Sequence, residues 1–279
     1  TGVSVEHQRD GVLHLAFSDD DETHHRESTA SQRALGLRAE TLDQRALRSL
    51  EPSVHPDARG AAFFPDDHRV DNRRLLEALR TLALKRGVSI REFTSLRAVE
   101  GGGERLEAVI ADGRKIAAPA LINALGAWAS QIHGVPENVS VRPVKGHMMT
   151  LVDGPRLRHV VYGREGYLVP RADGRLIVGS TMEEAGFDAR FTVEGFSRLA
   201  TIARNIAPAT AEATVSETWT GLRPATPDGL PVIGRSALRG VVIAGGLFRN
   251  GILLGPLVGE VAAGLALGDE PTIDLSAFN

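Results

Sequence analysis

Two short, largely apolar stretches, each followed by glycine, restrict most strongly what this chain can fold into. Residues 120–125 read Ala-Leu-Ile-Asn-Ala-Leu before Gly126, and residues 240–244 read Gly-Val-Val-Ile-Ala before Gly245-Gly246. The first is typical of a strand buried on both faces in a parallel sheet. The second leads through its glycine pair toward a Gly-rich helix at 251–267. Together they predict an α/β fold.

The rest of the chain has a different pattern, typical of antiparallel sheets. We expect strands at 147–152, 159–162, 167–170, 175–179 and 213–220, a meander at 88–93 with 96–99, 105–111 and 114–117, and opening strands at 3–8 and 12–17. We expect helices at 72–86, capped by Asp71, and at 192–206, with Ser18 as a further N-cap. The two patterns alternate along the chain, so the prediction is a mixed α/β, α+β-like protein of two discontinuous domains.

Composition excludes several functional classes. The 279 residues contain no cysteine and carry a formal net charge of −3, which argues against disulfides, thiolate chemistry and general nucleic-acid binding. The nine histidines lack metal-ligand spacing, so we expect no metal. The longest apolar stretch, 252–267, is interrupted by Glu260 and is too short for a membrane span. We expect a cytoplasmic protein.

Arg223 is the first candidate binding residue. It lies in Thr220-Gly-Leu-Arg-Pro-Ala-Thr-Pro-Asp-Gly-Leu-Pro-Val-Ile-Gly234, where proline and glycine fix the backbone on both sides. A rigidly held guanidinium is suited to bidentate recognition of a carboxylate. The alternative is an arginine that stacks on Trp219 or pairs at the surface.

Two further candidates are a glycine-rich segment and a tyrosine. Gly245–Leu254 joins an apolar strand to a helix, so its free N–H groups can bind an anionic group, or its small residues serve only close packing. Tyr167 is one of two tyrosines, and its hydroxyl can serve a ligand or a local core hydrogen bond.

These motifs resemble the FAD-dependent D-amino-acid oxidase family, with glycine oxidase of the thiamine pathway as the nearest branch. The resemblance rests on Gly221–Gly234 and Gly246–Pro256, supported by Arg142–Gly146, Gly166–Arg171 with Gly179–Met182, and Ala124–Trp128, in the family's order. It implies a substrate domain at 1–62 and 138–218 and an FAD-binding domain at 63–137 and 219–279.

The resemblance also implies an activity and its residues. The reaction is oxidation of glycine, sarcosine or a small D-amino acid to the imine, with dioxygen giving peroxide. Arg223 matches the carboxylate-binding arginine, Tyr167 its hydroxyl partner, Arg249 a residue whose backbone holds the amine, and Met182 a pocket wall. The FAD-contacting positions are Leu96, Ala124, Gly126, Leu247, Phe248, Arg249, Asn250, Gly251, Ile252 and Leu253.

One departure from the family pattern leaves alternatives open. The strand–GxGxxG–helix unit that holds the FAD pyrophosphate is absent from these residues, and Gly101–Gly103 cannot replace it because it joins two strands. We therefore expect an N-terminally truncated member that alone binds FAD weakly or not at all. A quinone-dependent D-amino-acid dehydrogenase, or a non-catalytic fragment that needs a complementing chain, are the alternatives. A homo-oligomer is possible in each case. Glu165 lies two residues before Tyr167 and thus on the same side of the expected strand, where it would repel acidic side chains; the alternative is that it faces solvent at the strand end.

Overall fold

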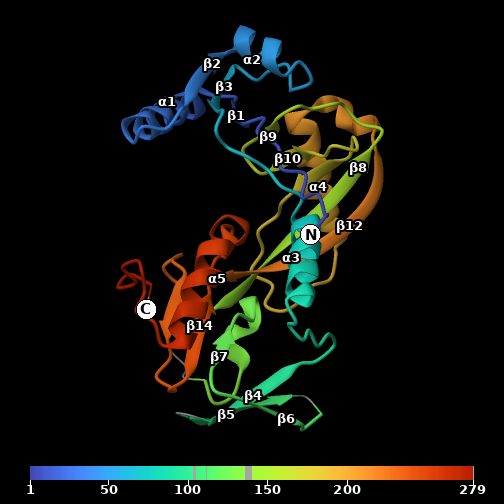
Figure 1. The fold of residues 1–279 in the computed structure, drawn as a ribbon. Coiled ribbons are helices and arrows are strands. Elements are labelled where there is room, and N and C mark those ends of the chain that lie inside the picture. Colours follow the sequence, from blue (N-terminus) through green and yellow to red (C-terminus); the bar gives the residue numbers. More distant parts are fainter. Residues whose placement is uncertain (103–104, 111, 136–139, 279) are drawn as a thin grey trace. The chain divides into compact units, whose positions relative to one another are not determined.

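The computed structural model describes residues 1–102, 105–110, 112–135 and 140–278 (Figure 1). Its residues form two compact units, and each unit is built from three separate chain segments. Unit 1 comprises Thr1–Val88, Gly146–Met182 and Arg190–Gly221. Unit 2 comprises Ser89–Lys145, Glu183–Ala189 and Leu222–Asn279. The expected α/β fold with mixed sheets is confirmed. Residues 63–88, which we expected in the FAD-binding domain, cluster with unit 1.

Unit 1 is built on an eight-stranded sheet whose order is β12-β8-β11-β10-β9-β1-β3-β2. The strands are β1 (Val12–Ala16), β2 (Glu40–Asp43), β3 (Gly60–Phe64), β8 (Arg142–Val152), β9 (Val160–Tyr162), β10 (Tyr167–Pro170), β11 (Leu176–Gly179) and β12 (Thr214–Ala225). β1 pairs antiparallel with β3 and parallel with β9. The β8 and β12 strands run on beyond the unit boundaries at residues 145 and 221.

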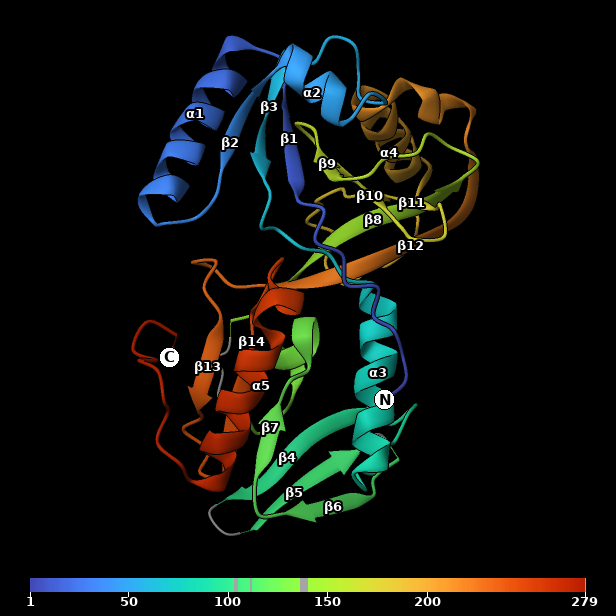
Figure 2. The ribbon, with the colours of Figure 1, turned by 45° about the horizontal axis from the view of Figure 1, so that its top comes forward.

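The two faces of this sheet carry different side chains. Leu13 and Leu168 are fully buried in a core shared with Leu199, Ile202 and Ile206 of α4 (Val193–Ile206). The other helices of the unit are α1 (Asp19–Ala34), α2 (Gln44–Leu50), α3 (Asn72–Lys85) and the 3₁₀ helix η2 (Pro208–Glu212) (Figure 2). Because strand side chains alternate, His14 and Tyr167 lie on the face opposite this core.

The expected helix starts are confirmed. Ser18 caps α1 in a capping box, since its hydroxyl accepts from Asp21 N while the Asp21 carboxylate accepts from Ser18 N. Asp71 accepts from the N–H groups of Arg73 and Arg74 at the start of α3. Both caps supply acceptors to N–H groups that have no partner within the helix.

Two expected strands are wrong. Residues 3–8 contain no strand, because Glu6 adopts a positive φ of 51° that breaks the extended backbone, and only Gln8 forms an isolated bridge, to Arg69. Residues 88–93 also form no strand. Phe93 has a φ of 54° there and its side chain is fully exposed, so no packing holds this segment extended.

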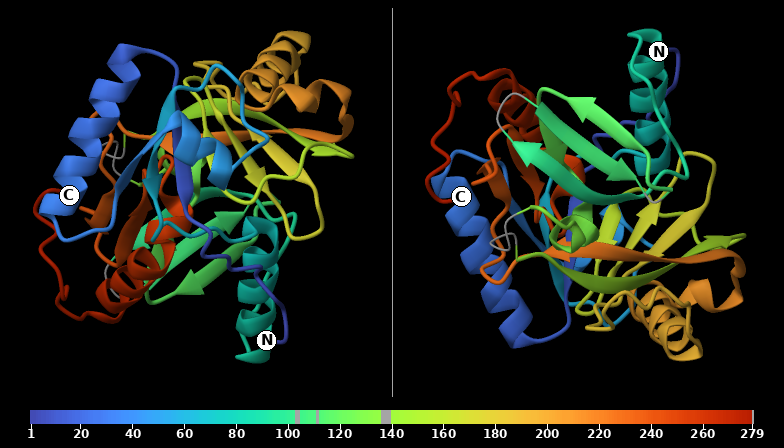
Figure 3. Two further views of the ribbon diagram at one scale, coloured as in Figure 1. Left: turned by 90° about the horizontal axis from the view of Figure 1, so that it is seen from above. Right: turned by 90° about the horizontal axis from the view of Figure 1, so that it is seen from below.

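Unit 2 contains two three-stranded sheets. β4 (Leu96–Gly102), β5 (Arg105–Ile110) and β6 (Lys115–Ala118) form the expected antiparallel meander (Figure 3). Gly103 and Ala111, which belonged to that expectation, lie outside the described residues. The second sheet has the order β13-β14-β7 and comprises β7 (Leu121–Asn123), β13 (Val232–Arg235) and β14 (Val241–Gly245). The expected parallel character of 120–125 is confirmed, because β7 pairs parallel with β14.

Helix α5 (Gly251–Leu267) packs on this second sheet. Its Val258, Val261, Ala262 and Leu265 form a buried cluster with Val242 of β14 and with Ile233 and Leu275. The 3₁₀ helix η1 (Gly126–Gln131) follows β7 directly. None of the helices in the described part of the chain combines the length and hydropathy that a bilayer-spanning segment needs.

A buried polar contact ties two distant segments of unit 1 together. The Glu51 carboxylate accepts from the backbone N–H groups of Arg158 (2.9 Å) and His159 (3.1 Å) and from His159 Nδ1 (3.0 Å). Glu51 and His159 are both buried, and each side chain is only 2% exposed. Without the carboxylate, two backbone donors would be left without an acceptor in a dry environment.

We therefore expect Glu51→Ala to lower the free energy of unfolding of unit 1 by about 2–5 kcal/mol. Urea unfolding followed by Trp219 fluorescence in a Trp128→Phe background measures this, because Trp128 and Trp219 are the two tryptophans and lie in different units. Glu194→Ala is the control: it removes an exposed i,i+4 ion pair with Arg198, which is expected to contribute under about 1 kcal/mol. Equal effects of the two changes would contradict the structural role of Glu51.

Candidate functional site

The predicted site residues fall in both units. Tyr167 and Met182 belong to unit 1, whereas Arg223, Arg249 and every expected FAD-contacting residue belong to unit 2. Each group is built by its own local structure.

Tyr167 is the first residue of β10 and stands in a row of aromatic side chains. Its ring lies 5.1 Å from the ring of Tyr162 on β9, which stacks on His14 of β1 at 4.6 Å and an interplanar angle of 8°. The strand register sets this row, because His14 pairs with Tyr162 and Tyr162 with Tyr167. The ring positions are thus fixed across three strands.

Gly179 makes room for the Tyr167 ring. The two residues pair in register, and a Cβ on Gly179 would lie 2.8 Å from atoms of that ring. Met182 follows three residues later and is 60% exposed. Within unit 1, the structure therefore presents Tyr167 and Met182 near the end of the β10–β11 hairpin.

Sequence reasoning missed His14 and Tyr162. A signal for His14 was available: the strand Val-Leu-His-Leu-Ala places one polar residue between two leucines, so alternation puts it on the face opposite the core. Tyr162 could not be singled out, because its contact with Tyr167 depends on the pairing of β9 with β10.

In unit 2, the carboxyl ends of β7 and β14 lie at the same edge of the sheet. Ile243 pairs with Asn123 in the parallel register, so Ala124 and Gly126 follow one strand where Gly245 and Gly246 end the other. Crevices at the carboxyl ends of parallel strands are the usual ligand sites of α/β sheets. Gly126 has a φ of 55° and open space where a Cβ would lie.

Asn123 is a third residue that sequence reasoning missed. It is 1% exposed, its Nδ2 donates to Ala129 O at 3.0 Å, and its Oδ1 accepts from Leu125 N at 3.3 Å. The side chain therefore fixes the turn that carries Ala124 and Gly126. A polar residue inside an otherwise apolar strand was the available signal.

The segments that carry Arg223 and Arg249 meet within unit 2. Phe248 N donates to Pro224 O at 2.9 Å, which joins the loop after β14 to the end of β12. Arg223 is half-buried on β12, and Arg249 is exposed. The Trp219 ring, which was the alternative partner expected for Arg223, has the Arg73 guanidinium 4.8 Å from its centre.

At the entry to α5, Phe248 N and Asn250 N already donate to Pro224 O and Leu247 O, which leaves the other N–H groups of residues 247–253 as candidate donors. Asn250 makes no side-chain cap, and the first turn of α5 contains no acidic residue. The first N–H groups of a helix have no intrahelical acceptor, and they lie at its positive end. This segment fits an electron-rich ring oxygen or another partly negative group, as the expected FAD contacts require.

Leu96, at the first position of β4, packs against the cluster of Val99, Leu106 and Ile132, against which Leu125 after β7 also packs. Among the described residues, no group of three or more His, Asp or Glu side chains is placed to hold a metal ion.

The family model for FAD dependent oxidoreductases, named DAO, matches residues 1–265. The chain belongs to this family, whose cofactor is FAD. It is 36% identical over 244 residues to the bifunctional protein ThiO/ThiG of Synechocystis sp., covering 85% of this chain and 37% of that protein.

Glycine oxidase of Geobacillus kaustophilus is 32% identical over 286 residues, covering 100% of this chain and 75% of that protein. The crystal structure of glycine oxidase from the same organism superimposes with a TM-score of 0.94 at 30% identity, covering 100% of this chain and 76% of that chain. The chain therefore spans little more than a third of one relative and about three quarters of the other, and the expected glycine-oxidase branch is confirmed.

A substitution at Gly246 tests how the loop after β14 is held in place. Its φ is 69°, and a Cβ there would lie 2.6 Å from Thr226 Cγ2 and 3.3 Å from Val232 N. We expect Gly246→Ala to destabilise unit 2 by about 1–3 kcal/mol, because it adds both backbone strain and a clash. Trp128 fluorescence during urea unfolding of a Trp219→Phe background measures it.

Gly245→Ala is the matched control, since a Cβ at Gly245 has no atom within 4 Å and its φ lies outside the left-handed region. If Gly245→Ala were as destabilising as Gly246→Ala, the close approach of Gly246 to Thr226 would not be what holds the loop.

Proposed function

We propose that this chain carries the amino-acid-oxidising function of its family, with glycine, sarcosine or a small neutral D-amino acid as substrate and dioxygen as acceptor. The observation that carries the proposal is the Phe248 N to Pro224 O hydrogen bond, which joins the segment of Arg223 to the loop of Arg249 at the carboxyl edge of a parallel strand pair. The similarity to glycine oxidase supports the same assignment.

The proposed role of Arg223 is to bind the substrate carboxylate. Its guanidinium can donate two parallel hydrogen bonds to the two carboxylate oxygens, which fixes the orientation of the amino acid as well as its position. The half-buried setting of Arg223 strengthens such an ion pair relative to one in bulk water. The proposed role of Tyr167 is to donate its hydroxyl to the same carboxylate.

Arg249 and the start of α5 are proposed to serve the amine and the cofactor. The Arg249 carbonyl oxygen would accept from the substrate amine, and Met182 would limit the space for the side chain. FAD, when bound, supplies the two-electron acceptor for the substrate Cα–H bond. Leu247, Arg249 and residues 251–253 would donate backbone N–H groups to the flavin ring, whereas Phe248 and Asn250, whose N–H groups already donate to Pro224 O and Leu247 O, would contact it in other ways. Leu96, Ala124 and Gly126 would contact the rest of the dinucleotide.

Catalysis would then come mainly from positioning. A carboxylate clamped by a rigid arginine and an amine held by a backbone carbonyl leave the Cα–H bond in one orientation, which lowers the entropic part of the barrier. Glu165 does not share a strand face with Tyr167, because β10 begins at Tyr167 and Glu165 lies in the turn before it. We therefore base the expected preference for small neutral substrates on Met182 and not on Glu165.

Steady-state assays of the FAD-loaded protein test the reaction. We expect oxygen uptake with glycine, sarcosine, D-alanine or D-proline, with one peroxide formed for each oxygen, and much less with D-aspartate. Turnover only with an added quinone would indicate the dehydrogenase alternative. D-Aspartate as the best substrate would contradict the proposed substrate class.

Arg223→Ala should lower kcat/KM by a factor that corresponds to about 2–5 kcal/mol of transition-state stabilisation, because the substrate carboxylate loses its half-buried charge partner. Arg223→Lys should recover only part of the loss, since an ammonium lacks the planar fork. Arg239→Ala removes an exposed arginine of the same unit and serves as the control. Near-normal kcat/KM in Arg223→Ala would place the carboxylate elsewhere.

A further inference from the structure

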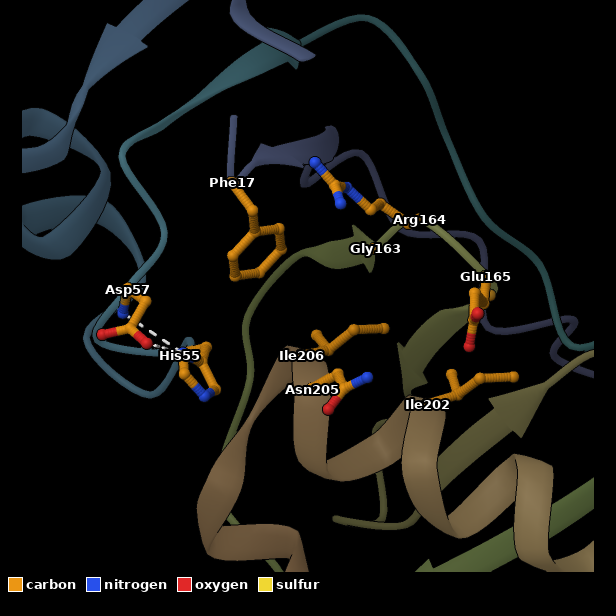
Figure 4. Close-up of a pocket in the computed structure, with 10 residues that line it drawn as sticks. Phe17, His55, Asp57, Gly163, Arg164, Glu165, Ile202, Asn205 and Ile206 are labelled. Carbon is orange, nitrogen blue, oxygen red and sulfur yellow. Dashed lines mark hydrogen bonds and ion pairs between the residues drawn. The ribbon is translucent and has the colours of Figure 1, made fainter. Parts of the chain in front are cut away.

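Unit 1 contains a cavity of about 330 Å³ that the proposed oxidation does not use (Figure 4). It lies between the β9–β10 turn, the C-terminal end of α4 and the segment that follows α2. Its walls include Phe17, Asp57, Arg164, Glu165 and Asn205.

This cavity lies on the face of the sheet opposite the Tyr167 ring. Ile202 and Ile206 of α4 line it, and they pack in the same core as Leu168. Since neighbouring residues of a strand point to opposite faces, the side chain of Tyr167 points away from that core. The cavity is therefore separate from the aromatic row of Tyr167.

The floor of the cavity is apolar and closely packed. Gly163 and Gly166 of the turn approach α4 so closely that a Cβ on either would lie 2.9 Å from Ile206 or Ile202, respectively. The Phe17 ring adds an aromatic wall, as Figure 4 shows. This floor can bury a short aliphatic chain.

The one arginine of the cavity is already paired. Arg164 Nη2 donates to Ser18 Oγ at 2.6 Å, and Nε and Nη2 donate to Asp21 Oδ2 at 3.1 and 2.9 Å. Burial opposes ionisation of Asp21, but the hydrogen bonds from Arg164, Phe17 N and Ser18 outweigh it and lower the pKa of Asp21. The charge of Arg164 is thus neutralised within the wall.

Two carboxylates, an amide and the imidazole of His55 remain. Among the described residues, the side chains of Glu165 and Asn205 make no hydrogen bond or ion pair. Asp57 is 83% exposed at its side chain, with His55 Nδ1 3.9 Å away. Figure 4 shows Asp57 and Glu165 on opposite sides of the cavity, with Ile206, Asn205 and Ile202 between them. The cavity thus has a negative group at each end and an apolar floor.

We propose that this cavity binds a linear aliphatic diamine. One ammonium would contact the Glu165 carboxylate and the Asn205 carbonyl oxygen, and the other would contact Asp57. The alkyl chain between them would lie on Ile202 and Ile206. A ligand with a carboxylate would meet two like charges and is disfavoured.

Isothermal titration calorimetry with 1,4-diaminobutane, n-butylamine and n-butyrate tests the site. We expect 1,4-diaminobutane to bind at least about fivefold more tightly than n-butylamine, and n-butyrate not to bind. Glu165→Gln and Asp57→Asn should each weaken the binding of 1,4-diaminobutane by about twofold to fivefold, the size of an exposed charge pair.

Both substitutions are at exposed positions, so circular dichroism should show an unchanged fold. Glu194→Gln is the matched control, because it neutralises an exposed carboxylate on α4 outside the cavity, and it should leave the affinity unchanged. The proposal is overturned if 1,4-diaminobutane does not bind, if n-butylamine or n-butyrate binds equally well, or if Glu165→Gln leaves the affinity unchanged.

Discussion

The pairing of β1 with two different partners is the constraint on which unit 1 depends. The strand pairs antiparallel with β3 on one side and parallel with β9 on the other, so it joins two parts of the sheet that are far apart in sequence. This register sends Leu13 and Leu15 into the core and His14 to the opposite face. A shift by one residue would exchange the faces, bury the histidine among leucines and separate it from Tyr162.

The parts of the candidate site are held by different physical means. The Tyr167 ring is positioned by cross-strand pairing and by the missing side chain of Gly179, whereas the loop of Arg249 is positioned by one backbone hydrogen bond and by the close approach of Gly246 to Thr226. The position of the Tyr167 ring is therefore a property of a whole sheet. The position of the Arg249 loop depends on a few local contacts, so single substitutions in this loop should have larger effects on the site.

Much of the fold could be predicted from the sequence because its signals are local. Asp71 and Ser18 predict helix starts as N-caps, and glycine-containing turns predict the meander of β4, β5 and β6. The segments 3–8 and 88–93 could not be predicted, because their apolar alternation is overridden by positive φ values at Glu6 and Phe93.

The site was predictable only in part, for a related reason. The motifs placed Arg223 and residues 247–253 in one expected site, but the hydrogen bond from Phe248 N to Pro224 O depends on tertiary packing. His14, Tyr162 and Asn123 are defined by partners on other strands or turns, which a single sequence does not reveal. Periodicity likewise predicted the leucines of α3 without predicting their surroundings: Leu76 and Leu79 are 68% and 54% exposed.

The discontinuous units have a consequence for the order in which the protein folds during synthesis. All three segments of unit 1 end by Gly221, whereas Leu222–Asn279 belongs wholly to unit 2 and supplies β13, β14 and α5. A growing chain therefore contains every residue of unit 1 while unit 2 still lacks two strands of its parallel-containing sheet and the helix that covers it. β7, with its apolar residues, can pair with β14 only after residues 241–245 have been synthesised, so the nascent chain leaves this strand edge unpaired until then.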